Sequence, residues 1–436
     1  MKTTTNIAVL TATLALSFTA FAQVDGVIHA GKVLVKPEQG ALREQTLVLE
    51  DGKVAAIHDG YRSLNTLGLA DVPVYDLKNH YVMPGMIDMH VHVTFERDKD
   101  ANPHNWLTKE DADYALHSIP YLKRTLDAGF TSVRDLGSNY KVIFPLKRAV
   151  EAQTIVGPRI FAAGNAVTPT GGHADLHGYR HDVTQTVNYS LGVCDGANDC
   201  QRAVRDVIKH GADVIKITAT GGVLSNTAAG VNQQLTDDEL TAIVNAAHNL
   251  GRKVAAHAHG TGGINAALRA GVDSIEHGSY LDDESIKLFK EHDAYLVPTL
   301  LAGHTVSEEV LSNPNMPKAV ADKVRQVAPK MEKAFRSALK NKVNIAFGTD
   351  SGVSRHGNNA YEARLMVKYG MTPKEVLVSA TRTAAKLLGQ EKYLGSLEVG
   401  KFADIIALEA DPEKDIKALS KVAFVMKNGV VYKQQD

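Results

Sequence analysis

The feature that most constrains the fold is an alternation of strand-like and helix-like segments across residues 84–390. Helix-like stretches such as residues 238–251 and 262–271 end in glycine, as a helix C-cap would. The candidate strands are residues 86–93, 131–136, 159–164, 212–219, 253–259, 273–278, 294–299 and 344–350. Eight strands interleaved with helices over about 300 residues predict a (β/α)8 barrel. A doubly wound open sheet is the structural alternative.

The two ends of the chain have a different character from the middle. Residues 23–83 and 391–436 are rich in short strands with turn signals between them. Asn428-Gly429 is a strong signal for a two-residue hairpin. These ends predict one small β-domain assembled from both termini.

Residues 1–22 have the composition of a secretory signal peptide. Lys2 supplies a short positive start, an apolar run covers residues 7–20, and a small-x-small sequence ends at Ala22. An uncleaved anchor is the alternative, but a membrane span needs about 20 apolar residues, and no later stretch approaches that length. We expect an exported protein, periplasmic or secreted after cleavage near Ala22, with no stable membrane anchor.

Export would give the two cysteines a role. Cys194 and Cys200 lie six positions apart in a segment rich in Gly, Asp and Asn. In an oxidising compartment this pair is predicted to form a disulfide, with two free thiols as the alternative.

Charge and histidine content narrow the ligand class. Lys and Arg number 48 and Asp and Glu number 49, so the formal net charge is -1. That balance argues against nucleic acid or an acidic membrane as the main partner. Histidine is over-represented, with 18 residues, so the positions of the histidines decide the functional prediction.

Polar residues fall near the carboxyl ends of the predicted strands. Alternate side chains of a strand point to one face, so His90 shares a face with His92, and His257 with His259. Three more candidates lie on other strands: Lys216, His277 and Asp350. Each alone has a simpler structural role, such as a hydrogen-bonded histidine or a helix-capping aspartate. In a barrel, however, all would meet at the rim that carries active sites.

This set of residues suits two divalent metal ions. Neutral imidazole and carboxylate are good ligands for zinc and related metals, with manganese, cobalt and nickel as alternatives to zinc. Lys216 is costly to bury as a free ammonium. Carboxylation by CO2 would turn it into a carbamate, whose two oxygens could bridge two metals.

The sequence resembles the amidohydrolase superfamily. Within it, the likeness is to the imidazolonepropionase-like branch of metal-dependent dipeptidases, which includes Xaa-Pro and Xaa-Arg dipeptidases and ochratoxin-hydrolysing amidohydrolases. The matching pieces are PGMIDMHVHV, DVIKIT, VAAHAHG, SIEHG, GTDSG and GSLEVGKFADIIAL. The resemblance implies a (β/α)8 TIM barrel over residues 84–390 and a small β-sandwich built from residues 23–83 and 391–436. It also implies a homo-oligomer.

The resemblance further implies a role for each candidate residue. His90, His92 and Asp350 would bind one metal, and His257 and His277 would bind the second. Carboxylated Lys216 would bridge the two ions. His259 is the rival ligand on the fifth strand, but His257 matches the first histidine of the family's HAHG pattern.

These roles imply hydrolysis of an amide bond. The metals would lower the pKa of a bridging water, and Asp350 would take its proton and deliver it to the leaving nitrogen. His173, after the third strand, is the candidate donor to the oxyanion, with an ordinary loop histidine as the alternative. His259 and Arg355 are expected to contact substrate, and Arg355 would pair with a carboxylate.

The expected substrates are dipeptides or N-acyl amino acids, including ochratoxin-type amides. A cyclic-amide hydrolase of the imidazolonepropionase type is one alternative, and a non-catalytic barrel scaffold is another. Imidazolonepropionase typically uses one metal and lacks the bridging lysine, so the presence of Lys216 favours the prediction of a dipeptidase. A scaffold would have lost metal ligands, whereas all six are present here.

Overall fold

A computed structural model describes residues 24–98, 105–180, 182–183, 192–225, 230–313 and 316–435. The predicted signal peptide, residues 1–22, lies outside the described residues. Among the helices of the described ranges, none combines the length and apolar character that crossing a membrane requires.

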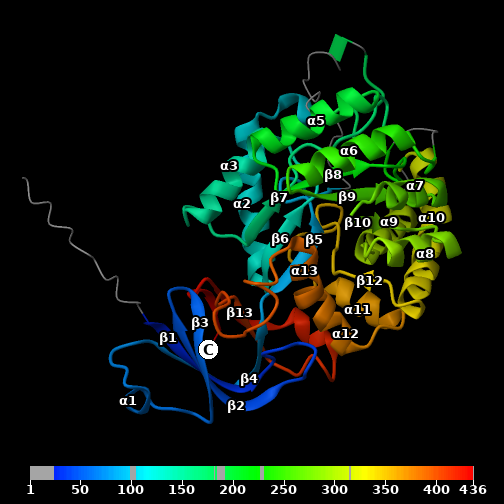
Figure 1. Ribbon diagram of the computed structural model, residues 1–436. Coiled ribbons are helices and arrows are strands. Elements are labelled where there is room, and N and C mark those ends of the chain that lie inside the picture. Colours follow the sequence, from blue (N-terminus) through cyan, green and yellow to red (C-terminus); the bar gives the residue numbers. More distant parts are fainter. Residues whose placement is uncertain are drawn as a thin grey trace, which may run out of the picture.

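The two ends of the chain form one seven-stranded sheet, which lies below the helical part of the molecule in Figure 1. Its strands, in spatial order, are β15 (Val430–Gln434), β14 (Val422–Lys427), β13 (Ile405–Leu408), β4 (Val74–Pro84), β1 (Val24–Val33), β2 (Leu42–Glu50) and β3 (Lys53–Asp59). The N-terminal and C-terminal segments meet where β13 pairs antiparallel with β4. The predicted hairpin at Asn428-Gly429 is confirmed: both residues have positive φ, +50° and +76°, and they join β14 to β15.

The middle of the chain supplies eight parallel strands among the described residues. They are β5 (Met86–Val91), β6 (Phe130–Asp135), β7 (Arg159–Ala162), β8 (Val214–Thr218), β9 (Lys253–Ala258), β10 (Ser274–His277), β11 (Tyr295–Val297) and β12 (Asn344–Ile345). Seven of them fall inside the predicted strands, and β6 begins one residue before its predicted start at residue 131. They form a three-stranded sheet, β5-β6-β7, and a five-stranded sheet, β12-β11-β10-β9-β8.

Backbone hydrogen bonds join these two sheets at both of their edges. On one side, the N–H of Met89 donates to the carbonyl of Phe347 at 2.9 Å, and that of Asp350 to His90 at 2.7 Å. On the other side, the N–H of Val167 donates to Lys216 at 2.8 Å. These bonds bring the chain beyond β12 alongside β5, so the segments that carry Asp350 and His90 are direct neighbours.

Helices surround the parallel strands (Figure 1). Their bounds are α2 (Asp111–Asp127), α3 (Tyr140–Glu151), α5 (Ala197–His210), α6 (Asp237–Asn249), α7 (Thr261–Ala270), α8 (Asp283–Glu291), α9 (Leu300–Ser312), α10 (Lys318–Lys340), α11 (Tyr361–Lys368), α12 (Pro373–Val378) and α13 (Ala384–Leu388), with a short α1 (Leu64–Leu67) in the N-terminal segment. Local sequence sets their ends. Thr236 and Glu239 form a capping box at the start of α6, and Gly271, with φ of +92°, ends α7 as the sequence predicts.

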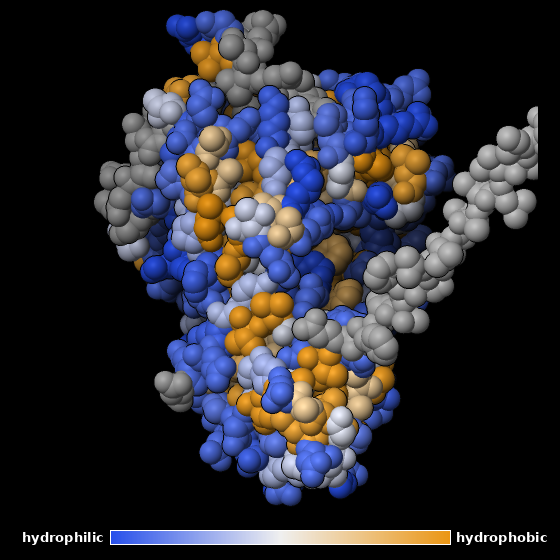
Figure 2. Space-filling view, turned by 90° about the vertical axis from the view of Figure 1, so that its left-hand side faces the viewer, coloured by the Kyte–Doolittle hydropathy of each residue, from blue (hydrophilic) through white to orange (hydrophobic). Residues whose placement is uncertain are grey.

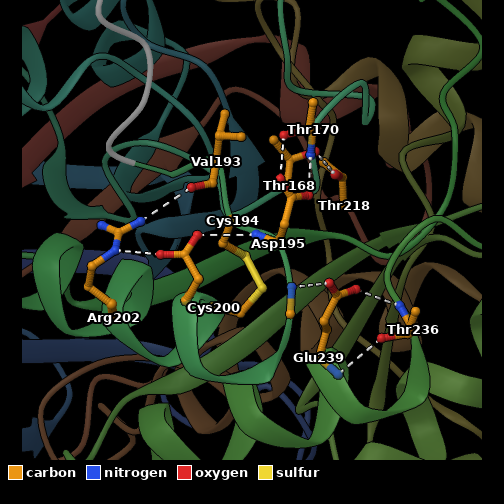
Figure 3. Close-up of a disulfide and its surroundings, with 12 residues drawn as sticks. Thr168, Thr170, Val193, Cys194, Asp195, Cys200, Arg202, Thr218, Thr236 and Glu239 are labelled. Carbon is orange, nitrogen blue, oxygen red and sulfur yellow. Dashed lines mark hydrogen bonds and ion pairs between the residues drawn. A yellow bond between two sulfur atoms is a disulfide. The ribbon is translucent and has the colours of Figure 1, made fainter.

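The predicted disulfide is present (Figure 3). The sulfur atoms of Cys194 and Cys200 are 2.07 Å apart. The backbone N–H of Cys194 donates to the carbonyl of Thr168 at 3.0 Å, and Asp195 accepts from both the backbone and the hydroxyl of Thr170. The disulfide is therefore joined to the segment that follows β7 and leads to His173.

Apolar surface gathers on the lower part of the molecule in Figure 2, where the seven-stranded sheet lies. Exposed apolar side chains on that sheet include Leu42, Val74 and Val430. Other side chains of the same sheet are packed: Ile28, Leu47 and Phe424 belong to one buried apolar cluster that draws on both chain ends. The terminal segments therefore share a core of their own.

Candidate metal centre

The predicted histidines and Asp350 converge at the carboxyl ends of the parallel strands. Potential ligand atoms of His90, His277 and Asp350 lie within 4.8 Å of one another. The same holds for a second group formed by His257, His259 and His277. His277 belongs to both groups, so the two candidate metal positions are adjacent.

His90 and His92 approach Asp350 from the end of β5. The Nδ1 atom of His90 lies 2.9 Å from Glu276 Oε2, and that of His92 lies 2.8 Å from the carbonyl of Gly137. Their Nε2 atoms are then left to face Asp350 Oδ1, at 3.6 Å and 3.2 Å respectively. One nitrogen of each ring is fixed by the protein, and the other is directed into the site, as metal-binding histidines require.

His259 and His277 are fixed in the same way by neutral hydroxyl groups. His259 Nδ1 lies 2.7 Å from Ser279 Oγ, and His277 Nδ1 lies 2.7 Å from Thr299 Oγ1. The ring centroids of these two histidines are 4.8 Å apart and nearly parallel. His257 lies between them and His173, with its ring centroid 4.2 Å from that of His173.

Most of these imidazoles are neutral at physiological pH. Burial lowers the pKa of His90 to about 4 and the pKa of His259 to about 3, and it holds the pKa of His257 and His277 well below the ordinary value. His92 differs: burial lowers its pKa, but the Asp350 carboxylate more than offsets this and raises it above the ordinary value. Neutral imidazoles present the lone pair that a metal needs.

Asp350 provides the test of whether a cation fits. Its Oδ1 atom is buried and makes no hydrogen bond to the described residues, although two imidazole nitrogens lie close by. Burial would raise the pKa of Asp350, but the neighbouring His90 and His92 outweigh it, so the pKa lies below its ordinary value. A buried carboxylate oxygen that accepts no hydrogen bond is costly without a cation beside it, so these residues fit a metal ion.

Lys216 lies in the floor of the same site. It is 4% exposed in a strand whose other residues are aliphatic or Thr, and its Nζ atom is 3.5 Å from His90 Nε2. Burial lowers the pKa of Lys216 to about 8. Burial therefore increases the fraction of the neutral amine, which is the form that reacts with CO2.

The structure brings His173 to this site but leaves Arg355 outside it. His173 Nδ1 contacts Ser225 Oγ, and a Cβ atom at Gly222 would come within 2.0 Å of the His173 ring, so only glycine leaves room for it. Arg355 is exposed and lines a separate hollow of about 550 Å³.

A cavity of about 1460 Å³ opens over the strand ends. Its floor is made of the candidate metal-site residues and His173. One wall is apolar and comes from α9 and α10: Val306, Val324, Val327 and Met331. The cavity also contains Arg97, which forms a two-pronged ion pair with Glu309, with both N–O distances at 2.8 Å.

Comparison with known proteins identifies the family. Residues 81–432 match the model of the amidohydrolase family. The chain belongs to this family. It is 34% identical to ochratoxinase from Aspergillus niger over 438 residues, which cover 93% of this chain and 86% of that protein. It is 26% identical to imidazolonepropionase from Shewanella sediminis over 85% of this chain and 88% of that protein.

Solved structures give the same answer for this amidohydrolase. A Xaa-Pro dipeptidase with methionine bound in its active site is 39% identical, with a TM-score of 0.88 over 94% of this chain and 99% of that one. The structure of A. niger ochratoxinase is 32% identical, with a TM-score of 0.83 over 95% of this chain and 96% of that one. The predicted family is confirmed: the chain is a metal-dependent hydrolase that acts on amide bonds, with a fold of the TIM-barrel type.

Sequence reasoning missed two charged residues of this amidohydrolase. Arg134 on β6 and Glu276 on β10 are 1% and 0% exposed, and they form an ion pair at 2.8 Å beneath His90. Burial would raise the pKa of Glu276, but Arg134, His90 and Lys216 together outweigh burial and lower it to about 2, so Glu276 presents a full negative charge to His90. The only available signal was a charged residue inside a predicted strand, and it was weaker than for Lys216, because β6 and β10 also contain other polar residues.

Proposed function

We propose that this amidohydrolase uses two divalent metal ions, zinc in the first instance, to cleave the amide bond of dipeptides or N-acyl amino acids. One observation carries the proposal: two groups of potential ligand atoms share His277, and one of them includes Asp350, whose Oδ1 is buried without a hydrogen-bond partner. His90, His92 and Asp350 would hold one ion, and His257 and His277 the other. His259 lies in the second group as well and is the rival ligand.

Lys216 would join the two ions once carboxylated. It lies within 3.5 Å of His90, and its burial favours the neutral amine. A carbamate would replace a buried cation by an anion with two ligand oxygens, which would compensate the positive charge of two metals.

We also propose that the parallel strands close into a (β/α)8 barrel over residues 84–390. The backbone hydrogen bonds that join the two parallel sheets beside β5 and beside β8 support this closure.

The terminal segments, residues 23–83 and 391–436, would form the accompanying β-sandwich. One buried cluster unites Leu47 of β2 with Phe424 of β14, and this supports the sandwich, because three other strands separate β2 from β14 in the sheet order. The Cys194–Cys200 disulfide supports export, since such bonds persist in oxidising compartments. The exposed apolar side chains of the sheet support a homo-oligomer.

The chemistry divides among the residues of the site. When bound, the metal ions would polarise the scissile carbonyl and lower the pKa of an attacking water. Asp350 Oδ1 would accept the proton of that water and then deliver it to the leaving nitrogen, since it is ionised and faces the site. His173, whose Nδ1 is taken by Ser225, would donate from Nε2 to the oxyanion.

The cavity supports a substrate larger than a cyclic imidazolone. Its volume of about 1460 Å³ and its apolar wall suit an amide with a bulky apolar group. The relatives named ochratoxinase and Xaa-Pro dipeptidase point to the same substrate class. His259 would contact the substrate from the floor. The carboxylate role predicted for Arg355 stays a prediction, although that side chain does not line this cavity.

The test is a metal analysis of the purified protein combined with a library of dipeptides and N-acyl amino acids. We expect hydrolysis that chelation abolishes and added metal restores. Lys216→Ala should lose at least one ion and most of the activity. Lys427→Ala is the matched control: Lys427 is also 4% exposed, with a pKa that burial lowers to about 8, but it donates to Gly157 far from the site.

Lys427→Ala should therefore keep both metals and the wild-type kcat even if it lowers stability. A Lys216→Ala variant that keeps both ions and full activity would refute the bridging role. A carbamate carbon signal after growth in isotope-labelled bicarbonate should appear in the wild type and disappear in Lys216→Ala only.

A further inference from the structure

Helix α9 begins at Leu300 directly after the short strand β11, and its first turn lines the cavity. The residue at its N-cap is Thr299, a type that normally caps a helix through its side chain. Here Thr299 makes no such bond, and its backbone is left-handed, with φ of +47°. Its hydroxyl is engaged elsewhere, 2.7 Å from His277 Nδ1.

A distant carboxylate takes over the cap. Glu362 lies on α11, and its Oε1 accepts from the N–H of Leu300 at 3.0 Å while its Oε2 accepts from that of Leu301 at 2.6 Å. Glu362 is completely buried. Burial raises the pKa of Glu362 to about 8, against the two backbone N–H bonds, which act to lower it. A carboxyl group held at this cost has a specific task.

We propose that Glu362 is a positioning residue for the metal centre. By capping α9 in place of Thr299, it holds Thr299 in the strained left-handed conformation and frees its hydroxyl to orient His277. His277 itself has a φ of +71°, so neither residue reaches this arrangement by local preference. The inference rests on the proposed function, because it requires His277 to be a metal ligand.

The alternative is that Glu362 only stabilises a helix end. Glu375 offers a matched control, since its carboxylate accepts from the N–H of Thr372 at 2.8 Å and caps α12 at an exposed position remote from the cavity. Loss of either cap should lower the stability of the protein. Only loss of Glu362 should alter how His277 binds metal.

The experiment is a double-mutant cycle on metal affinity. The variants are Glu362→Gln, Thr299→Val, the double variant and Glu375→Gln, and the readout is zinc affinity by competition with a chelator, together with kcat. We expect the first two to weaken the weaker-bound zinc by about 10–100-fold, as is usual for groups that support a ligand. The double variant should be little worse than either single one, because both act through the same hydroxyl. Glu375→Gln should bind zinc as the wild type does.

The outcomes separate the inference from the proposed function. If the wild type binds zinc but Glu362→Gln binds it equally well, or if the two effects multiply, the positioning role is wrong and the proposed function stands. If the wild type binds no zinc, the proposed function fails and this inference fails with it. Should Glu362→Gln not fold, Glu362→Asp, which keeps the carboxyl group but shortens its reach, takes its place in the cycle.

Discussion

The candidate metal centre has two parts that the protein supports in different ways. We call His90, His92 and Asp350 the carboxylate half, because Asp350 itself and Glu276 behind His90 bring negative charge to it. We call His257, His259 and His277 the hydroxyl half. There the supporting groups are uncharged: Ser279 Oγ and Thr299 Oγ1.

The difference predicts unequal affinities. A divalent cation in the carboxylate half meets formal negative charge in a buried setting, where Coulomb attraction is strong. In the hydroxyl half it meets neutral ligands only, so charge must come from outside that half. In the proposed function, carboxylated Lys216 would supply this charge, and the second ion would then depend on the modification of a lysine.

The largest expected effect tests the acid–base carboxylate. Asp350→Asn keeps the shape of the side chain but removes the charge and the proton acceptor, so kcat for amide hydrolysis should fall by about 10²–10⁴-fold. The control is Asp404→Asn, which removes another buried aspartate that pairs with Arg159 away from the cavity. Steady-state kinetics measure both. Near-normal turnover by Asp350→Asn would remove the proposed proton carrier.

A smaller effect, on metal affinity, is expected from two variants that compare the two halves directly. Glu276→Gln removes the charge behind His90, whereas Ser279→Ala removes a neutral partner of His259. Loss of a group that hydrogen-bonds to a metal-binding histidine usually lowers metal affinity by about 10–100-fold. We expect Glu276→Gln, which removes a charge, to lower the affinity more than Ser279→Ala does. Chelator competition on both variants gives the ranking. If Ser279→Ala weakens binding more than Glu276→Gln does, the charge-based distinction between the halves is incorrect.

The smallest effect on activity is expected outside both halves, at the disulfide. Replacing Cys194 and Cys200 by Ser opens a short loop, which should cost about 2 kcal/mol of unfolding free energy. The metal ligands do not touch this loop, so kcat should change by less than about two-fold, the level of ordinary surface effects. Thermal unfolding and kinetics of the double Ser variant check this. A large loss of kcat would mean that the bond between Cys194 and Thr168 positions His173.

The sequence was enough to predict the strands, the family and the convergence of the histidines. Strand alternation places His90 with His92 and His257 with His259, and parallel strands bring their carboxyl ends together whatever the loops do. Arg355 was predicted to pair with a substrate carboxylate, but its side chain lines a separate hollow. Its position could not be read from the sequence, because a residue five positions beyond a predicted strand end depends on the path of a loop, and a loop has no periodic sequence pattern.

The supporting residues were also beyond sequence reasoning. Glu276 points away from the cavity, and its importance appears only once β10 lies beside β6 and the side chain meets both Arg134 and His90. Glu362 reaches a helix 62 positions earlier in the chain. Such contacts depend on packing between distant elements, which a single sequence does not specify.

The most direct test of the account is the metal content of the purified enzyme set against its amide hydrolase activity during stepwise chelation. The account predicts two equivalents of divalent metal per chain. The first equivalent to leave should come from the hydroxyl half and take most of the activity with it, and added zinc with bicarbonate should restore it. Full activity in a protein that retains one equivalent or none would contradict the two-metal centre.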